Sequence, residues 1–195
     1  MNYFRQTNSN FSVTLIGGEP CTGKSTLMKK IIKDHKIDKD FEHGKLLKGH
    51  QSSDFVIAGL YEGQLFDGTD RLSMAVQPVF IDYIKKKMDK KHVLLEGDRL
   101  FKPSLIQFMF ELPIDFRLII LHVDEEIKKQ RHVDRGDNQT EKWLNAKKTT
   151  VNNIKNKFDY SLLKNNNEQE MEKAIDYIIN RKRDKMVSPA QESFF

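Results

Sequence analysis

The segment 18–25, with the sequence GEPCTGKS, has two glycines five positions apart, followed directly by a lysine and a hydroxyl residue. A loop that wraps an anion with its backbone N–H groups needs residues that tolerate unusual φ and ψ angles, and Gly18 and Gly23 provide this freedom. Lys24 can then reach the β- and γ-phosphates of a nucleotide, and the Ser25 hydroxyl can ligate Mg²⁺. The spacing therefore predicts a phosphate-binding loop (P-loop) for a nucleoside triphosphate.

The elements around this loop have the order that the motif requires. A β-rich run, 12–16, precedes the loop, and a helical pattern follows from Lys24 to about Lys33. The N-terminus of such a helix favours an anion through its dipole. The residues expected to contact the nucleotide are Gly18, Cys21, Thr22, Gly23, Lys24, Ser25 and Thr26.

A second group of chemically capable residues follows the apolar run 92–95. A P-loop enzyme needs an acid near Mg²⁺, and ligands collect at the carboxyl ends of parallel strands, so Glu96 is a candidate to hold the metal. Asp98 is a candidate to accept the proton of an attacking hydroxyl, and Arg99 to orient the acceptor. The alternative interpretation of this segment is an exposed, charged turn.

Arg131 and Arg135 are four positions apart, so they share one face of a predicted helix. Two like charges at this spacing cost a few tenths of a kcal/mol unless an anion lies between them. A triphosphate would satisfy both arginines, and they could stabilise charge on the transferred phosphoryl group by closing over it as a lid. Pairing with Glu126, Asp134 or Asp137 at the surface is the alternative.

The segment 67–74, with the sequence DGTDRLSM, follows the second apolar run and is dense in polar groups. Such a loop at the same sheet edge as a P-loop favours acceptor binding by Asp67, Thr69, Asp70 and Arg71. Asp70 is an alternative general base, and Arg71 could contact an anion. The competing interpretation is a helix N-terminus capped by Asp67 or Thr69.

Apolar runs alternate with helical patterns along the chain, which is typical of strand–helix units stacked around a parallel sheet. Strands are expected at 12–16, 55–60, 92–95, 116–123 and 160–163, and helices at 24–33, from near Pro78 to Met88, at 104–110, at 124–135, from Thr140, and from after 165–167 to Ile178. The predicted fold class is α/β, a three-layer αβα P-loop NTPase fold with a mostly parallel sheet of about five strands and a helical lid. We expect one domain at 1–182, with the lid at about 124–145, and a flexible C-terminal tail at 183–195.

The composition is typical of a globular protein: of 195 residues, 38% are hydrophobic and 31% are charged, which suits one domain with a sizeable core. We expect a cytoplasmic protein with no membrane association, since no apolar stretch reaches 18 residues and the first ten residues are polar. A single cysteine allows no internal disulfide. The net charge of +5 suits a protein that handles nucleotides or DNA, and it suits a lysine-rich solubilising surface equally well.

Taken together, these motifs resemble those of the small P-loop kinases of nucleotides and related substrates. They are the P-loop, the segment Tyr61–Met74, the strand end Leu95–Arg99, and the helix with Arg131 and Arg135. More narrowly, they are similar to the bacteriophage P-loop kinases that phosphorylate 5-hydroxymethylpyrimidines, such as 5-hydroxymethyluridine, within DNA. The resemblance implies ATP as donor, Mg²⁺ as cofactor, a hydroxymethyl group as acceptor and, for a phage protein, the host cytoplasm.

The resemblance covers residues 12 to 180 approximately, and the strand end departs from the nucleotide-kinase pattern. It has Glu-Gly-Asp-Arg where those kinases have Asp-Gly-Phe-Pro-Arg, which argues against a free nucleoside monophosphate as acceptor. The leading prediction is transfer of the γ-phosphoryl of ATP to the hydroxymethyl group of a modified pyrimidine in DNA. The alternatives are a kinase of a free nucleotide, nucleoside or other small molecule, and an ATP-hydrolysing binding module or switch.

Overall fold

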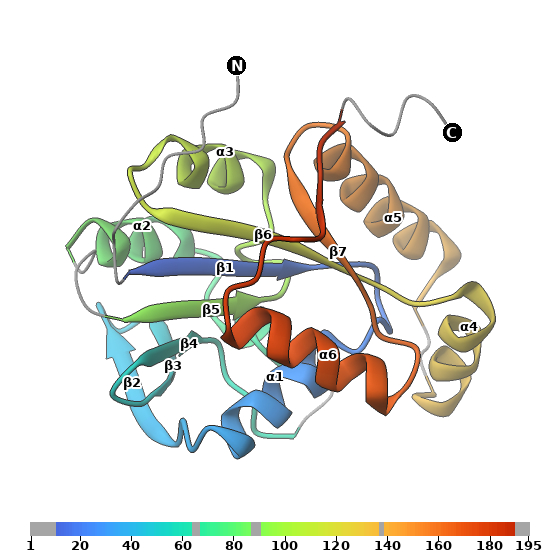
Figure 1. Ribbon diagram of the computed structural model, residues 1–195, viewed down its shortest axis with the longest axis horizontal. Coiled ribbons are helices and arrows are strands. Elements are labelled where there is room, and N and C mark those ends of the chain that lie inside the picture. Colours follow the sequence, from blue (N-terminus) through green and yellow to red (C-terminus); the bar gives the residue numbers. More distant parts are fainter. Residues whose placement is uncertain (1–10, 64–66, 87–90, 137–138, 190–195) are drawn as a thin grey trace. The chain divides into compact units, whose positions relative to one another are not determined.

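The computed structural model describes residues 11–63, 67–86, 91–136 and 139–189 (Figure 1). Within these residues, eight strands form one sheet, hydrogen-bonded in the order β2-β3-β4-β5-β1-β6-β7-β8. The strands are β1 (Ser12–Gly17), β2 (Lys39–His43), β3 (Leu47–Gln51), β4 (Phe55–Ala58), β5 (His92–Glu96), β6 (Asp115–His122), β7 (Tyr160–Lys164) and β8 (Met186–Val187). The mostly parallel α/β fold is confirmed, but the expected count of about five strands is wrong.

The helices among the described residues lie close to their predicted positions. They are α1 (Lys24–Asp34), the short 3₁₀ helix η1 (Thr69–Arg71), α2 (Val76–Lys86), α3 (Pro103–Glu111), α4 (Glu125–Asp134), α5 (Glu141–Lys155) and α6 (Glu168–Ile179). Helix α2 begins two residues before the expected start at Pro78, because proline is tolerated in a first turn whose N–H groups have no intrahelical partner. Its expected end at Met88 lies outside the described residues.

The chain divides into two compact units, each continuous in space but not in sequence. Unit 1 comprises the described residues up to Leu15 together with His35–Arg117, and unit 2 comprises Ile16–Asp34 together with the described residues from Leu118 onward. The P-loop therefore belongs to unit 2, whereas Glu96, Asp98 and the segment 67–74 belong to unit 1.

Unit 1 contains a β-hairpin that the sequence pattern does not predict. β2 pairs antiparallel with β3, and β3 pairs antiparallel with β4. β2 has the sequence KDFEH, in which only Phe41 is buried. Charged residues are common on such a strand at the end of a sheet, because they discourage pairing with other chains. The pairing, rather than an apolar run, makes this segment a strand.

The centre of unit 1 is the parallel pair β4 and β5, with Phe55 opposite His92 and Ala58 opposite Leu95. Residues 56–58 and 93–96 are all buried. Near-continuous burial is expected of parallel strands that are covered on both faces. Helix α2 packs against β3 in the same unit. These contacts fix the carboxyl end of β5, from which Glu96 emerges.

In unit 2, strands β6 and β7 pair in parallel. Helix α6 packs against both β7 and α1. The caps of two helices explain where they begin. The Thr140 side chain accepts a hydrogen bond from the N–H of Trp143 at 3.3 Å, and that of Asn167 accepts from Glu170 at 3.0 Å. Such caps satisfy N–H groups that have no intrahelical partner.

The last strand, β8, lies within the segment 183–195, for which the sequence predicts a tail. Met186 pairs antiparallel with Ser161 of β7, and Val187 pairs with Tyr160. A strand of two residues, held by main-chain pairing and by the Ser161 hydroxyl at 3.2 Å from the Met186 sulfur, leaves no periodic pattern in the sequence. Residues 190–195 lie outside the described part of the chain.

Gly49→Ala should destabilise the protein, because a Cβ at this position of β3 would lie 1.9 Å from the carbonyl oxygen of Ile57. Backbone cannot move out of the way as a side chain can, so we expect a loss of about 2–3 kcal/mol in the free energy of unfolding, measured by urea denaturation. The control is Gly136→Asn, with φ of +61° and open space around the position, which should cost less than about 1 kcal/mol. Equal stability of Gly49→Ala and the wild type would contradict the close β3–β4 packing.

Candidate functional site

The P-loop of unit 2 has an unusual backbone at three positions. The φ angles are +143° at Gly18, +60° at Cys21 and +84° at Gly23. A Cβ at Gly18 would lie 2.6 Å from the carbonyl oxygen of Leu121, and one at Gly23 would lie 2.5 Å from Nδ2 of Asn165. Both glycines are therefore required by the space around them as well as by their φ angles. The positive φ of Cys21 costs about 1–2 kcal/mol, and such strain is typical of ligand-binding loops.

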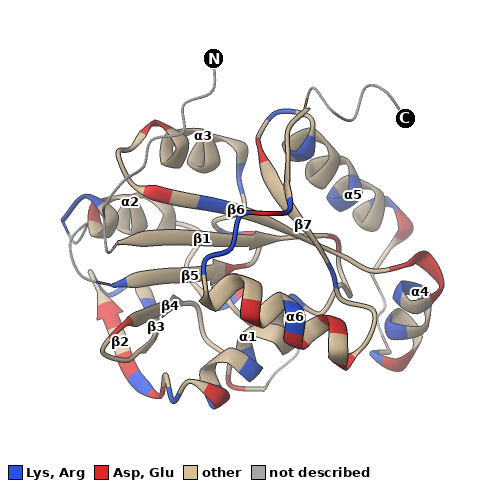
Figure 2. Ribbon diagram, in the orientation of Figure 1, with Lys and Arg blue, Asp and Glu red and all other residues tan. Residues whose placement is uncertain are grey.

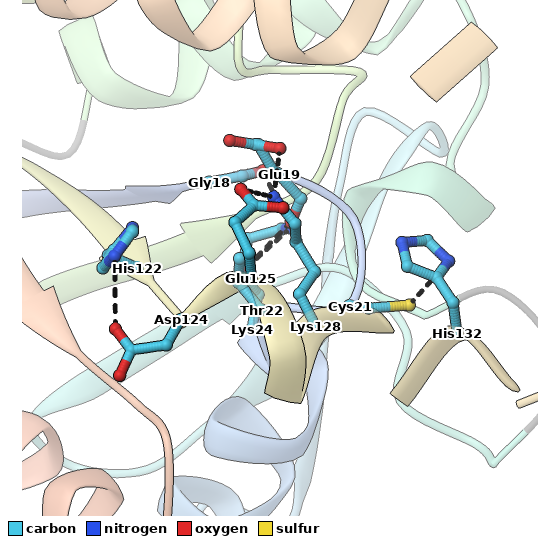
Figure 3. Close-up of polar contacts among 10 residues, drawn as sticks. All are labelled: Gly18, Glu19, Cys21, Thr22, Lys24, His122, Asp124, Glu125, Lys128 and His132. Carbon is cyan, nitrogen blue, oxygen red and sulfur yellow. Dashed lines mark hydrogen bonds and ion pairs between the residues drawn. The ribbon is translucent and has the colours of Figure 1, made fainter. Parts of the chain in front are cut away.

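The ammonium group of Lys24 is held by the loop itself (Figure 3). Its Nζ donates to the carbonyl oxygens of Gly18 at 3.0 Å and Glu19 at 2.8 Å. The Thr22 hydroxyl also donates to the Glu19 carbonyl at 2.8 Å. These bonds place a positive charge at the loop that the sequence predicts to receive phosphates, and they immobilise a long side chain in advance of binding.

Lys128 of α4 links that helix to the P-loop. Its Nζ lies 2.8 Å from a carboxylate oxygen of Glu19 and 2.7 Å from one of Glu125 (Figure 3). Burial disfavours the charged lysine, but the hydrogen bonds to Glu125 and Glu19 outweigh it and raise the pKa of Lys128. The hydrogen bond from Lys128 also lowers the pKa of Glu125. The sequence could indicate the Glu125–Lys128 pair from its spacing, but not the partner in the loop.

Arg131 lies between the P-loop and the turn after β7. One terminal nitrogen donates to the carbonyl oxygens of Asn165 at 2.9 Å and Asn166 at 3.2 Å, and the other to that of Cys21 at 3.5 Å. The buried side chain of Asn165 in turn donates to the carbonyl of Thr22 at 2.7 Å. Arg131 therefore joins two loops through main-chain acceptors, a positioning role that the sequence does not predict.

One further residue of α4 contacts the P-loop. Nδ1 of His132 lies 3.3 Å from the sulfur of Cys21 (Figure 3), a contact that the sequence does not predict. Arg135, the second arginine predicted to contact the triphosphate, is the exposed C-cap residue of this helix. The two arginines thus differ in their surroundings, although they share a helix face.

In unit 1, the end of β5 and the predicted acceptor segment are tied together. The N–H of Asp98 donates to a carboxylate oxygen of Asp70 at 2.6 Å, and Nε of Arg99 donates to the carbonyl of Leu72 at 3.4 Å. Glu96 is only 2% exposed. The alternative of an exposed charged turn is therefore wrong for Glu96, and Asp70 of the predicted acceptor segment is hydrogen-bonded to the backbone that follows it.

Close contacts around the end of β5 explain why positions 68 and 97 are glycines. A Cβ at Gly68 would lie 2.2 Å from a carboxylate oxygen of Glu96, and one at Gly97 would lie 2.6 Å from the hydroxyl oxygen of Thr69. The N-cap of η1 is Gly68, with no side-chain hydrogen bond, so the competing interpretation of a helix capped by Asp67 or Thr69 does not hold for η1.

Arg71 of the acceptor segment pairs with Glu62, with 2.8 Å between the guanidinium and the carboxylate. The anion contact that the sequence predicts for Arg71 would have to compete with this ion pair.

Carboxylates dominate the electrostatics of this part of unit 1. Burial, and then the charge of Asp98, raise the pKa of Asp70, although hydrogen bonds from the backbone N–H groups of Asp98 and Arg99 oppose the rise. Burial, and then the nearby Glu96, hold the pKa of Tyr61 well above its ordinary value. Among the described residues, no group of three or more His, Cys, Asp or Glu side chains is arranged to bind a metal ion by itself.

No protein-family model matches the chain, and no curated protein matches it. The chain is similar to solved structures of a gluconokinase from Sinorhizobium meliloti 1021 (11% identity, 88% of this chain and 98% of that chain, TM-score 0.45) and a sugar kinase from Janibacter sp. HTCC2649 (14% identity, 93% and 97%, TM-score 0.47). A shikimate kinase from Bacteroides thetaiotaomicron is also similar (11% identity, 87% and 97%, TM-score 0.45). At these values the similarity carries no inference about activity or substrate.

No helix in the ranges 11–63, 67–86, 91–136 and 139–189 is long and apolar enough to span a membrane.

Asp70→Asn should change the stability of the protein in a pH-dependent way. Because the pKa of Asp70 is raised on folding, the folded state binds this proton more tightly, and stability falls as the pH rises above the ordinary pKa of 3.8. Asparagine keeps an oxygen for the N–H of Asp98 but carries no charge. The variant should gain stability relative to the wild type at pH 7, and the gain should shrink towards pH 4, as measured by denaturation at both pH values.

Asp82→Asn is the matched control, because hydrogen bonds from His43 and Lys86 lower the pKa of Asp82. A lowered pKa contributes stability above the unfolded-state value and loses it as the pH falls, so this variant should lose stability at pH 7, and less at pH 4. Its effect should be small, since the pair is solvent-exposed. The same pH trend in both variants would contradict the burial of the Asp70 charge.

Proposed function

We propose that this protein is an ATP-dependent phosphotransferase of the P-loop kinase class, which transfers the γ-phosphoryl group to a hydroxyl. The observation that carries the proposal is the P-loop, in which the Lys24 ammonium is bonded to the carbonyls of Gly18 and Glu19. Phosphate oxygens can replace those carbonyls as acceptors, while the loop N–H groups and the N-terminus of α1 add further attraction. Lys24 then stabilises the charge that develops on the transferred group.

Arg131 and Arg135 are proposed to stabilise the same charge from α4. The bonds of Arg131 to main-chain carbonyls of two loops, one of them the P-loop, support this role. A guanidinium that is fixed in advance needs little reorganisation during the reaction. Arg135 would approach from the exposed end of the helix. Closure of the segment 124–145 as a lid remains part of this proposal.

Ser25 and Glu96 are proposed to hold Mg²⁺. Their hydroxyl and carboxylate oxygens suit this hard cation, which usually takes only one or two protein ligands and completes its shell with phosphate oxygens and water. When bound, Mg²⁺ neutralises charge on the β- and γ-phosphates.

At the acceptor, Asp98 is the proposed general base, and Asp70 is the alternative. The base takes the proton from the acceptor hydroxyl as its oxygen attacks the γ-phosphorus, and the bond to the β-phosphate oxygen breaks to release ADP. Asp67, Thr69, Arg71 and Arg99 are proposed to bind the acceptor. The hydrogen bond between Asp70 and the N–H of Asp98 supports a shared role, because it fixes the two carboxylates relative to each other.

The proposed acceptor is a hydroxyl group, either on a hydroxymethylpyrimidine in DNA or on a small molecule. The resemblance of Gly68–Met74 supports the DNA acceptor, and the lysines of α5 add positive charge in unit 2 (Figure 2). The near-complete burial of Thr69 and Glu96 supports a small acceptor group.

Lys24→Ala should lower the rate of phosphoryl transfer at least about 100-fold, because it removes a cation aimed at the developing charge. The thermal unfolding temperature should stay close to that of the wild type. Lys30→Ala is the control, since Lys30 lies on the same helix and pairs with Asp34 and Glu172 at the surface. Transfer by Lys24→Ala at the rate of the control would exclude the proposed role of the loop.

The acceptor can be assigned by incubating the protein with γ-labelled ATP and Mg²⁺, and then locating the label. The three arms are DNA with 5-hydroxymethyluracil, ordinary DNA, and a mixture of small alcohols. We expect label in a phosphate monoester in the first or third arm. Label only in inorganic phosphate would instead indicate an ATP-hydrolysing switch and contradict the kinase assignment.

A further inference from the structure

Asn165, which directly follows β7 in unit 2, holds one peptide bond of the P-loop by its carbonyl group. Its Nδ2 donates to the carbonyl oxygen of Thr22 at 2.7 Å, and the residue is 2% exposed. Asn165 is itself fixed, because its N–H donates to the carbonyl of His122 at 2.9 Å and its carbonyl accepts from Arg131 at 2.9 Å. A buried amide held in this way keeps a constant position beside the loop.

The hydrogen bond to Thr22 also sets the direction of the next N–H group in the loop. A trans peptide bond is planar, so its C=O and N–H point in opposite directions. The described residues contain no cis peptide bond. Since the carbonyl of Thr22 points towards Asn165, the N–H of Gly23 points away from it. Within the described part of the chain this N–H donates to no other group, so a ligand can accept its hydrogen bond.

Gly23 is the residue that makes an external support necessary. Reversal of the peptide plane between Thr22 and Gly23 changes φ of Gly23 by roughly 180°, and glycine adopts both signs of φ readily. A side chain at this position is excluded, because its Cβ would lie 2.5 Å from Nδ2 of Asn165. The loop therefore contains a peptide that its own residue types leave free to turn, and the bond from Asn165 restricts it.

The place of Gly23 in the loop indicates which ligand group its N–H could bind. Gly23 immediately precedes α1 and Lys24, and its carbonyl accepts the first hydrogen bond of the helix, from the N–H of Leu27 at 2.9 Å. Backbone N–H groups of a P-loop contact the α- and β-phosphates of a nucleotide, and the lysine contacts the β- and γ-phosphates. The β-phosphate is the group that both can reach, and the dipole of α1 favours an anion there.

We propose that Asn165 is a positioning residue of the P-loop, which aims the N–H of Gly23 at the β-phosphate of a nucleotide by holding the carbonyl of Thr22. The nucleotide rests on the proposed function, whereas the direction of the peptide in the free protein does not. An N–H that already points the right way requires no reorganisation on binding. Without Asn165, only the molecules in which the peptide has the correct direction bind the β-phosphate tightly.

The central variant is Asn165→Ala, which removes the donor without adding charge or bulk. Asn165→Leu, which is close to asparagine in shape, is the second test. The matched control is Asn167→Ala in the same turn. Asn167 caps α6 by accepting from the N–H of Glu170 at 3.0 Å, so its loss lowers the melting temperature without touching the P-loop. The control therefore separates general destabilisation from the loss of the bond to Thr22.

The direction of the Gly23 N–H is measured first, without nucleotide, from its residual dipolar coupling in ¹⁵N-labelled protein. We expect this coupling to change in both Asn165 variants and to stay at the wild-type value in Asn167→Ala. The couplings of β6 and β7 should be the same in all four proteins. An unchanged Gly23 coupling in the Asn165 variants would overturn the proposal and would leave the proposed kinase activity unaffected.

The dissociation constants of ADP with Mg²⁺ and of AMP are then measured by calorimetry. Both Asn165 variants should bind ADP about 10-fold more weakly than the wild type, because a hydrogen bond to a charged group is lost, and AMP should change by less than about 2-fold. Asn167→Ala should bind both nucleotides as the wild type does.

Wild-type affinity for ADP in the Asn165 variants would overturn the proposal. An equal loss of affinity for ADP and AMP would also overturn it, since the loop would then be distorted as a whole. Failure of the wild type to bind ADP would refute both the proposed function and this role of Asn165. Binding of ATP and ADP without any phosphoryl transfer would refute the kinase activity alone and leave the role of Asn165 standing.

Discussion

The hydrogen bonds between the Lys24 ammonium and the carbonyls of its own loop are the interaction on which the proposed nucleotide site of this protein depends. They can form because positive φ angles at Gly18 and Gly23 bend the backbone around the end of the side chain. Other groups of unit 2 then hold this loop from outside: Lys128 through Glu19, and Asn165 through the carbonyl of Thr22. The loop is thus shaped by local sequence and fixed by distant residues.

The proposed acceptor side in unit 1 depends on a different constraint, in which two glycines leave room for side chains of the neighbouring segment. Gly68 lies against the carboxylate of Glu96, and Gly97 lies against the hydroxyl of Thr69. This contact brings polar groups into a buried space where each needs a partner.

Local patterns predicted most of the fold, because continuous apolar runs such as 93–95 and 118–121 specify buried parallel strands. They failed where pairing alone defines the element, as in β2 and β8. For the site, the spacing of Gly18, Gly23 and Lys24 was sufficient to locate the loop. The contacts of Lys128 with Glu19 and of Arg131 with Cys21 join residues more than 100 positions apart, and only the folded chain brings them together.

The most direct test of this account is the dissociation constant for ATP, measured by calorimetry with Mg²⁺ for the wild type and Gly23→Ala. A methyl group at Gly23 would lie 2.5 Å from Nδ2 of Asn165 on a backbone with φ of +84°, so the loop would have to change shape. The account predicts that the wild type binds ATP and that the variant binds it about 100-fold more weakly, a change of about 2.7 kcal/mol. Equal affinity of the two proteins, or no binding by the wild type, would contradict it.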